Sequence, residues 1–153
     1  MSRAFVKEME DGVEELPERP ISPHPNLVTA EGLAHIEAEV TRLQQEHAAA
    51  QAANDRPALA RAARDLRYWT ARRATAELVA APSERSKVHF GSTVTIVRND
   101  GRRQTFRIVG EDEADPARGT LSHVSPLARA LFGKELGDTV KVAQSEAEIV
   151  EIA

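Results

Sequence analysis

The sequence predicts an α+β protein, with an N-terminal antiparallel helical hairpin, a two-helix coiled coil, followed by an antiparallel sheet domain with one short helix. Two observations support this prediction. The first half holds two alanine-rich segments with apolar residues at helical spacing, separated by a break at residues 54–57. From about residue 90 the apolar spacing changes to a period of two, which is typical of strands.

The first helix is expected to begin after Thr29, a good N-cap residue, with Glu31 in the first turn where the helix dipole favours negative charge. Its buried stripe is expected to hold Leu33, Ile36, Val40, Leu43, His47 and Ala50. Towards the break the large residues give way to alanine, which contributes far less when buried. We therefore expect a firm base and a weakly held tip.

The second helix is expected to start with Asp55 as its cap and Pro57 in its first turn, and to end before Pro82. Its stripe is expected to hold Leu59, Ala62, Leu66, Trp69, Arg73 and Ala76. Helices of roughly 24 residues would each extend about 36 Å, too long for a compact domain of this size to bury. The hairpin should therefore project, with Asn54, Asp55 and Arg56 at its tip.

The second half predicts a small sheet. Two strands flank the turn Asn99-Asp100-Gly101, a third follows at about 121–124, and two more at 139–143 and 148–152 complete it. Ser125 and Pro126 predict the start of a short helix that ends at Gly133. The expected domains are a flexible acidic arm with four prolines at 1–26, the hairpin at 27–82 and the sheet domain at 83–153.

Charge is unevenly distributed along the hairpin. Residues 27–53 carry four acidic side chains against Arg42, whereas residues 54–80 carry six arginines against three acidic side chains. Ion pairing between and along the helices accounts for this pattern. A second interpretation, compatible with the first, is a basic strip of Arg56, Arg61, Arg64 and Arg67 that contacts a nucleic-acid backbone.

Composition excludes several classes of protein. The chain has no cysteine, which excludes a disulfide scaffold and a cysteine zinc site. It has no apolar run of membrane-spanning length, and its first 20 residues carry six acidic side chains, unlike a signal peptide. We expect a cytoplasmic monomer that has no contact with membranes.

No motif indicates catalysis, a cofactor or a phosphate-binding loop. The five histidines lack metal-ligand spacing, and the acidic run at 111–115 is expected to be a solvated loop rather than a calcium site. Asp55 is the one carboxylate at the tip and hence the sole metal candidate there, although capping alone explains it. We therefore expect no enzyme, no cofactor and no metal.

Several segments resemble the C-terminal domain of the bacterial Gre transcription elongation factors. They are, in the family's order, residues 90–94, 106–115, 122–131 and 137–138, which read FGSTV, FRIVGEDEAD, SHVSPLARAL and GD. A weaker likeness to the opening of the GreB-type hairpin continues into residues 26–33. The resemblance thus covers most of the chain, but not its first 20 residues.

The resemblance implies an FKBP-like sheet domain that docks on RNA polymerase, at the rim of the secondary channel against a coiled coil of the largest catalytic subunit. The hairpin would enter the channel, near nascent RNA or DNA. Carried over by motif, the docking residues are Ser125, Pro126, Leu127 and Arg129. A short helix starting at Ser-Pro presents a small, rigid surface that a partner helix can meet with little ordering cost.

The tip departs from the family. Factors that stimulate transcript cleavage carry a Gly-Asp-x-x-Glu-Asn-Ala-x-Tyr tip, whose two carboxylates help to hold the polymerase's second magnesium ion. This chain lacks that motif, and its hairpin is shorter than usual in the family. We expect a polymerase-binding regulator of elongation without strong cleavage stimulation, and the alternative is a true cleavage factor that uses Asp55 to rescue backtracked polymerase.

Two other classes stay open. A prolyl isomerase would follow from the FKBP-like resemblance, but it needs an aromatic-lined pocket, and the sheet part holds only Phe90, Phe106 and Phe132. A hairpin that binds free nucleic acid would use the arginines, but no stacking aromatic lies near the tip.

Overall fold

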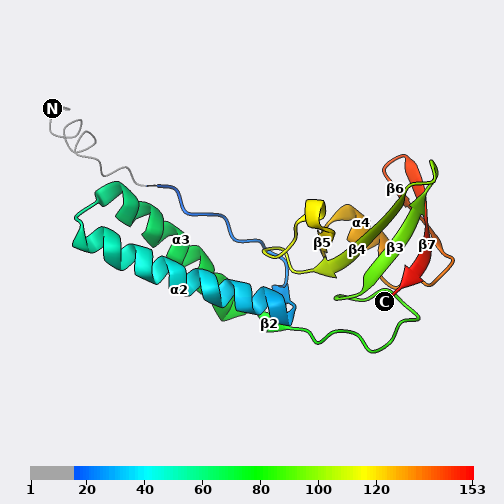
Figure 1. Ribbon diagram of the computed structural model, residues 1–153, viewed down its shortest axis with the longest axis horizontal. Helices are drawn as coiled ribbons and strands as arrows, with labels where there is room; N and C mark the ends of the chain where they lie inside the picture. The colour runs from blue at the N-terminus through cyan, green and yellow to red at the C-terminus, as the bar shows by residue number, and fades with distance from the viewer. Residues whose placement is uncertain (1–15) are drawn as a thin grey trace. The chain divides into compact units, whose positions relative to one another are not determined.

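The computed structural model describes residues 16–153, which fold into a helical hairpin and a five-stranded sheet (Figure 1). The α+β prediction is confirmed. Contacts divide the described chain into two compact units, one holding residues 16–23 with Ala34–Thr75, the other holding His24–Leu33 with Ala76–Ala153. None of the helices formed by residues 16–153 is long and apolar enough to span a bilayer.

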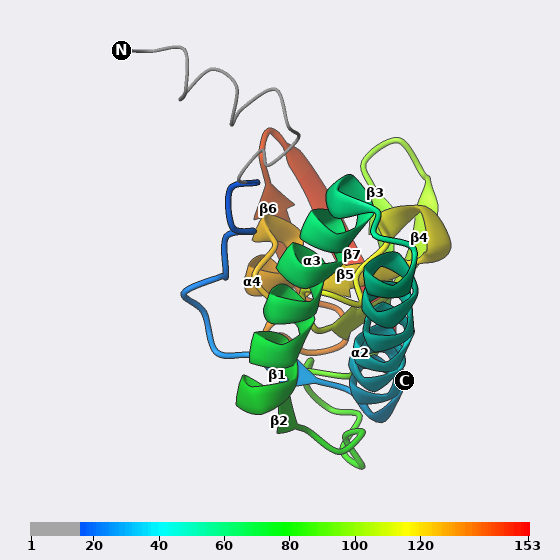
Figure 2. The same ribbon diagram turned by 90° about the vertical axis from the view of Figure 1, so that its left-hand side faces the viewer.

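The hairpin consists of α2 (Ala30–Ala52) and α3 (Arg56–Thr75), which lie antiparallel and side by side (Figures 1 and 2). The predicted stripe of α2 is largely confirmed, because Ile36, Val40, Leu43 and Ala50 are buried, while Leu33 and His47 are half-buried. On α3 the buried residues are Ala62, Trp69 and Arg72.

Two details of α3 differ from the prediction. Arg73 is exposed and its neighbour Arg72 is buried, so the predicted position of the arginine in the stripe is wrong by one residue. The helix also ends at Thr75 instead of just before Pro82. The chain leaves the helix because Glu77 and Val79 donate their N–H groups to the carbonyls of Asn26 and Val28, at 2.8 and 3.0 Å.

These hydrogen bonds form a two-stranded parallel ladder between β1 (Leu27–Val28) and β2 (Glu77–Leu78). The residues that lead into α2 and those that follow α3 are therefore adjacent. Gly110 lies directly against this ladder, where a β-carbon would come within 2.4 Å of the Leu27 carbonyl oxygen. A close backbone approach of this kind requires glycine.

The sheet has the strand order β5-β4-β3-β7-β6. Its strands are β3 (Thr93–Arg98), β4 (Arg103–Val109), β5 (Thr120–Ser122), β6 (Thr139–Val142) and β7 (Ser145–Ile152). All neighbours are antiparallel except β4 and β5, which are parallel, so the sheet is mainly antiparallel with one parallel pair at its edge. The reason is the connection through the short 3-10 helix η1 (Pro116–Arg118), which returns the chain before β5 begins.

A single apolar core lies between the sheet and α4 (Pro126–Leu131). Alternate strand residues point into it, as the period-two pattern predicts, and Val94, Ile96, Ile108 and Ile149 are fully buried. The predicted turn at 99–101 is confirmed, with Gly101 at a φ of 85° and the Asp100 carboxylate accepting the Arg102 N–H at 3.0 Å.

The acidic run at 111–115 is half-buried, so the prediction of a solvated loop is wrong. Glu113 lies against the first turn of α2, where its Oε1 accepts a hydrogen bond from the Thr29 hydroxyl at 2.6 Å. Gly32 makes room for it, since a β-carbon there would lie 2.4 Å from Glu113 Oε2. The positive end of the α2 dipole favours a carboxylate in this place. Thr29 also accepts the Gly32 N–H at 3.0 Å, which confirms it as the cap.

Candidate functional site

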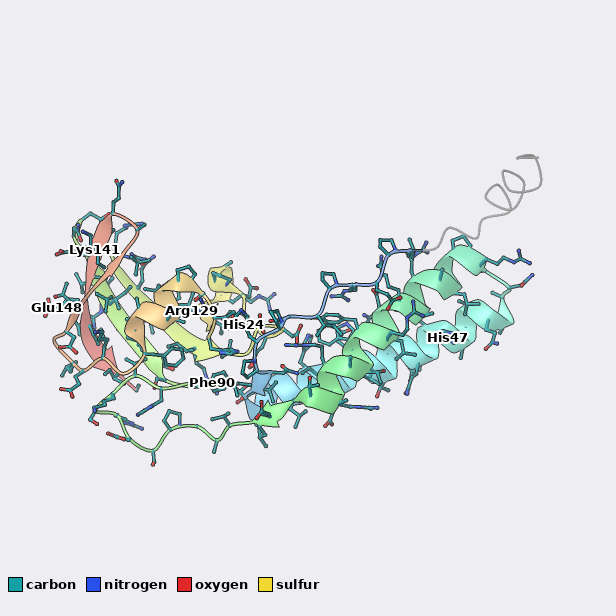
Figure 3. All side chains as sticks on the ribbon, turned by 180° about the vertical axis from the view of Figure 1, so that it is seen from behind. His24, His47, Phe90, Arg129, Lys141 and Glu148 are labelled. Carbon is teal, nitrogen blue, oxygen red and sulfur yellow. The ribbon has the colours of Figure 1, made fainter. Side chains whose placement is uncertain are left out.

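The predicted docking helix α4 begins as the sequence indicates. Ser125 is its N-cap, with its hydroxyl accepting the Ala128 N–H at 3.3 Å, and Pro126 occupies the first turn, where a missing N–H costs nothing. Pro126 and Arg129 are exposed and Ser125 is half-buried. Figure 3 labels Arg129 on this helix.

Leu127 differs from the other three candidate docking residues, because it belongs to the core of the sheet domain. Together with Ala128 and Leu131 it fastens the inner face of α4. The surface that α4 offers to a partner therefore consists of Ser125, Pro126 and Arg129. Leu127 can act on a partner only by holding that surface in place.

The tip of the hairpin is a short turn in which every residue from Gln51 to Pro57 is exposed. Asn54 adopts a left-handed φ of 53°, and the Asp55 N–H donates to the Ala50 carbonyl at 2.9 Å. Asp55 Oδ1 accepts the Ala58 N–H at 3.2 Å. The carboxylate of Asp55 is thus the cap of α3, as predicted.

No other carboxylate of the hairpin assists Asp55. Glu46 is bound to Arg42 at 2.6 Å, and Asp65 is bound to Arg64 at 3.1 Å and to Arg19 at 3.5 Å. Nowhere in residues 16–153 do three or more histidine or acidic side chains come together as metal ligands would. A magnesium ion at this tip would need its other oxygen ligands from a partner.

The four arginines of the predicted basic strip all lie on α3 but have different surroundings. Arg64 is half-buried and pairs with its neighbour Asp65. Arg67 is exposed and binds the carboxylate of Glu18, which lowers the pKa of Glu18 and raises that of Arg67. Arg56 and Arg61 are exposed and form no ion pair with any residue in the described part of the chain.

Sequence patterns did not indicate the contacts of the N-terminal arm. Residues 16–23 form no helix or strand, yet Arg19 lies with its guanidinium carbon 4.0 Å from the centre of the Tyr68 ring. The pairing of Glu18 with Arg67 spans 49 positions. Only the coincidence of an acidic and proline-bearing arm with an arginine-rich helix could have suggested it. The part of the predicted flexible arm before residue 16 lies outside the described residues.

A groove of about 580 Å³ lies on the hairpin. Its lining consists of His47 from α2, which Figure 3 labels, together with Leu66, Arg67, Thr70 and three alanines from one face of α3. It has no aromatic wall and one charged group at its rim. This groove does not have the lining that a catalytic pocket requires.

Comparison with known proteins identifies the family. Residues 82–153 match the family model described as "Transcription elongation factor, GreA/GreB, C-term". The chain is 51% identical over 78 residues to transcription elongation factor GreA of Alkalilimnicola ehrlichii, covering 48% of this chain and 49% of that protein. It is 35% identical over 130 residues to GreA of Agrobacterium fabrum, covering 84% of this chain and 79% of that protein.

The chain thus spans about half the length of the first of these relatives and over three quarters of the second. Among solved structures, the GreA factor homolog Gfh1 of Thermus thermophilus aligns over 85% of this chain and 99% of its own, at 21% identity and a TM-score of 0.41. That score is too low to support the assignment, which depends on the sequence matches. On those matches, the chain belongs to the GreA/GreB family of transcription elongation factors.

Proposed function

We propose that this protein is an RNA polymerase-binding regulator of transcription elongation that stimulates transcript cleavage weakly or not at all. In this proposal the sheet domain docks at the rim of the secondary channel through Ser125, Pro126 and Arg129, and the hairpin enters the channel. The protein itself is not an enzyme and acts in the cytoplasm as a monomer. The family assignment supports the choice of partner.

The observation that carries the cleavage part of the proposal is the surroundings of Asp55. Two-metal hydrolysis needs oxygen ligands that hold the second ion and orient the attacking water. The tip offers one carboxylate, and that carboxylate already accepts the Ala58 N–H. Glu46 and Asp65, the nearest acidic residues along the two helices, are engaged by arginines. The tip is therefore better suited to occupying the channel than to holding a metal ion.

A cleavage assay on backtracked polymerase tests this part directly. The wild-type chain should leave the stalled transcript intact or cut it far more slowly than a cleavage-competent relative. The informative variants are Asp55→Asn, which keeps an oxygen for capping and removes the charge, and Asp55→Ala, which removes both. Strong cleavage by the wild type that is lost in Asp55→Asn would establish the alternative, a true cleavage factor.

Docking is tested by pull-down with core polymerase. Arg129→Glu reverses an exposed charge on α4 and should reduce polymerase binding about tenfold or more, in line with charge pairs at an interface. Lys141→Glu makes the same change of charge on the exposed face of β6 and serves as the matched control. Equal binding of wild type, Arg129→Glu and Lys141→Glu would place the docking surface elsewhere, and no binding by the wild type would refute the proposal.

A prolyl-isomerase activity has no support in the sheet domain. Phe90 is buried in the core, with its ring edge-on to His123 at 5.6 Å between centroids. Phe106 and Phe132 pack against the same core. The three phenylalanines therefore stabilise the domain and do not line a peptide-binding pocket.

A further inference from the structure

Side chains of the N-terminal arm, residues 16–23, contact α3. Glu18 binds the guanidinium of Arg67, with both carboxylate oxygens 3.0 Å from Arg67 Nε. Arg19 lies over the Tyr68 ring at 4.0 Å and reaches Asp65 at 3.5 Å. The arm, blue in Figure 1, belongs to the same compact unit as α3.

The arm occupies cationic groups that would otherwise face solvent. Arg67 is the last member of the basic strip defined above, and the guanidinium fork that holds Glu18 is the group that would bind a phosphate in the same bidentate manner. Asp65, which Arg19 contacts, also neutralises Arg64. With the arm in place, Arg56 and Arg61 near the tip are the members of the strip that remain open to an anion.

These contacts are of a kind that a competing anion can replace. Glu18 and Arg67 are 63% and 56% exposed, so their pairing is weak and is screened by salt. The arm has no helix or strand in residues 16–23, so its release breaks no backbone ladder. A polyanion that also binds Arg56 and Arg61 gains a third cation when it displaces Glu18.

We propose that residues 16–23 form a displaceable cover over the basic side of α3, and that a nucleic-acid backbone displaces Glu18 from Arg67. The proposal rests on the proposed function in one respect, because the hairpin meets nucleic acid inside the polymerase. The cover keeps the free protein from binding nucleic acid through Arg67. It opens where phosphates are concentrated.

The first test measures binding of the full chain to a fluorescein-labelled single-stranded RNA at several salt concentrations. Glu18→Gln should tighten binding about 1.5- to 5-fold, the range expected for an exposed ion pair. The slope of log K against log salt should stay close to that of the wild type, because RNA reaches Arg67 in both proteins. The double variant Glu18→Gln with Arg67→Gln should lose the gain in affinity and flatten the slope by about 0.7, the value for one neutralised phosphate fewer on a single strand.

Glu37→Gln is the matched control, because Glu37 is exposed on α2 and pairs with no cation among residues 16–153. It makes the same change of net charge without touching the arm. Its effect on affinity should be smaller than that of Glu18→Gln, and its salt slope should equal that of the wild type. Equal effects of the two substitutions would overturn the proposal.

Arg19→Gln should change RNA affinity in opposite directions, depending on whether net charge alone or a cover fastened by Arg19 explains the binding. Removing a cation should weaken RNA binding if charge alone matters. If the arm is a cover that Arg19 fastens, the same substitution should tighten RNA binding. Weaker binding would leave the arm as a brace for α3 and would refute the cover.

The fluorescence of Trp69, the single tryptophan of the chain, reports the arm independently of affinity. The guanidinium of Arg19 lies 5.8 Å from the Trp69 ring centre, so release of the arm should change the emission. RNA added to the wild type should reproduce the change seen in Arg19→Gln without RNA. RNA binding without this change would show that the arm stays in place, whatever the polymerase pull-down gives.

Discussion

The N-termini of α3 and α4 use one capping arrangement in two different surroundings. In each, a short polar side chain accepts the N–H of an alanine three residues later, from Ala58 to Asp55 at 3.2 Å and from Ala128 to Ser125 at 3.3 Å. Each helix also has a proline in its first turn. In both helices the local sequence thus satisfies one of the N–H groups that have no partner inside the helix.

What differs is the packing behind the cap. Beneath α4, Leu127, Ala128 and Leu131 are buried in the core of the sheet domain. At the start of α3, Arg56 and Pro57 are exposed and Ala58 and Leu59 are only half-buried. The position of α4 is fixed by a core, whereas the position of the tip depends on its cap and a few small contacts. The start of α4 is therefore held rigidly, and the start of α3 is less constrained.

The largest expected effect comes from removing the packing behind α4. Leu131→Ala deletes a fully buried side chain and should lower the free energy of unfolding by about 2–5 kcal/mol. Leu59→Ala, the matched change near the tip, removes a half-buried side chain and should cost clearly less. Urea unfolding of the two variants measures the difference, and equal losses would mean that the tip is as firmly packed as α4.

A third helix start, that of α2, gives an intermediate effect. Gly32→Ala would place a β-carbon 2.4 Å from the end of the Glu113 carboxylate, and Gly110→Ala would place one 2.4 Å from the Leu27 carbonyl. Overpacking costs about 1–3 kcal/mol, and backbone yields less than a side chain, so Gly110→Ala should be the more destabilising. Adding Glu113→Ala should relieve Gly32→Ala and leave Gly110→Ala unrelieved. Thermal unfolding of the four variants checks both statements.

The smallest expected effect comes from removing either cap, and the two losses should appear in different measurements. Ser125→Ala and Asp55→Ala should each cost about 1 kcal/mol at the helix start. For Ser125→Ala the loss should appear in global unfolding, because α4 opens with the core. For Asp55→Ala it should appear as faster amide exchange at Ala58 and Leu59, with the melting temperature nearly unchanged. Faster exchange throughout α3 would show that the hairpin opens as one unit.

Local chemistry made much of this fold predictable. The caps at Thr29, Asp55 and Ser125 depend on residues within three positions of each other, so the sequence displays them directly. The turn at Gly101 and the alternation of buried strand residues are equally local. The same holds for the alanine-rich tip.

The predictions that are wrong depend on distant partners. Helix α3 ends at Thr75 because Glu77 and Val79 bond to residues about fifty positions away, and helical spacing alone does not reveal such a competitor. The burial of Glu113 against Gly32 has the same origin. The attachment of the arm was missed for the same reason, because the sequence around Glu18 gives no sign that Arg67, 49 positions later, binds its carboxylate.

The β1–β2 ladder has a consequence for how such a hairpin can change its length. Because Leu27–Val28 is hydrogen-bonded to Glu77–Leu78, the chain leaves the sheet domain and returns to it at one place. Equal insertions or deletions in α2 and α3 therefore alter the reach of the hairpin without altering its attachment. Seven residues added to each helix would extend it by about 10 Å and preserve the buried stripe. The length of the hairpin can therefore change in steps of about two helical turns while the sheet domain keeps its structure.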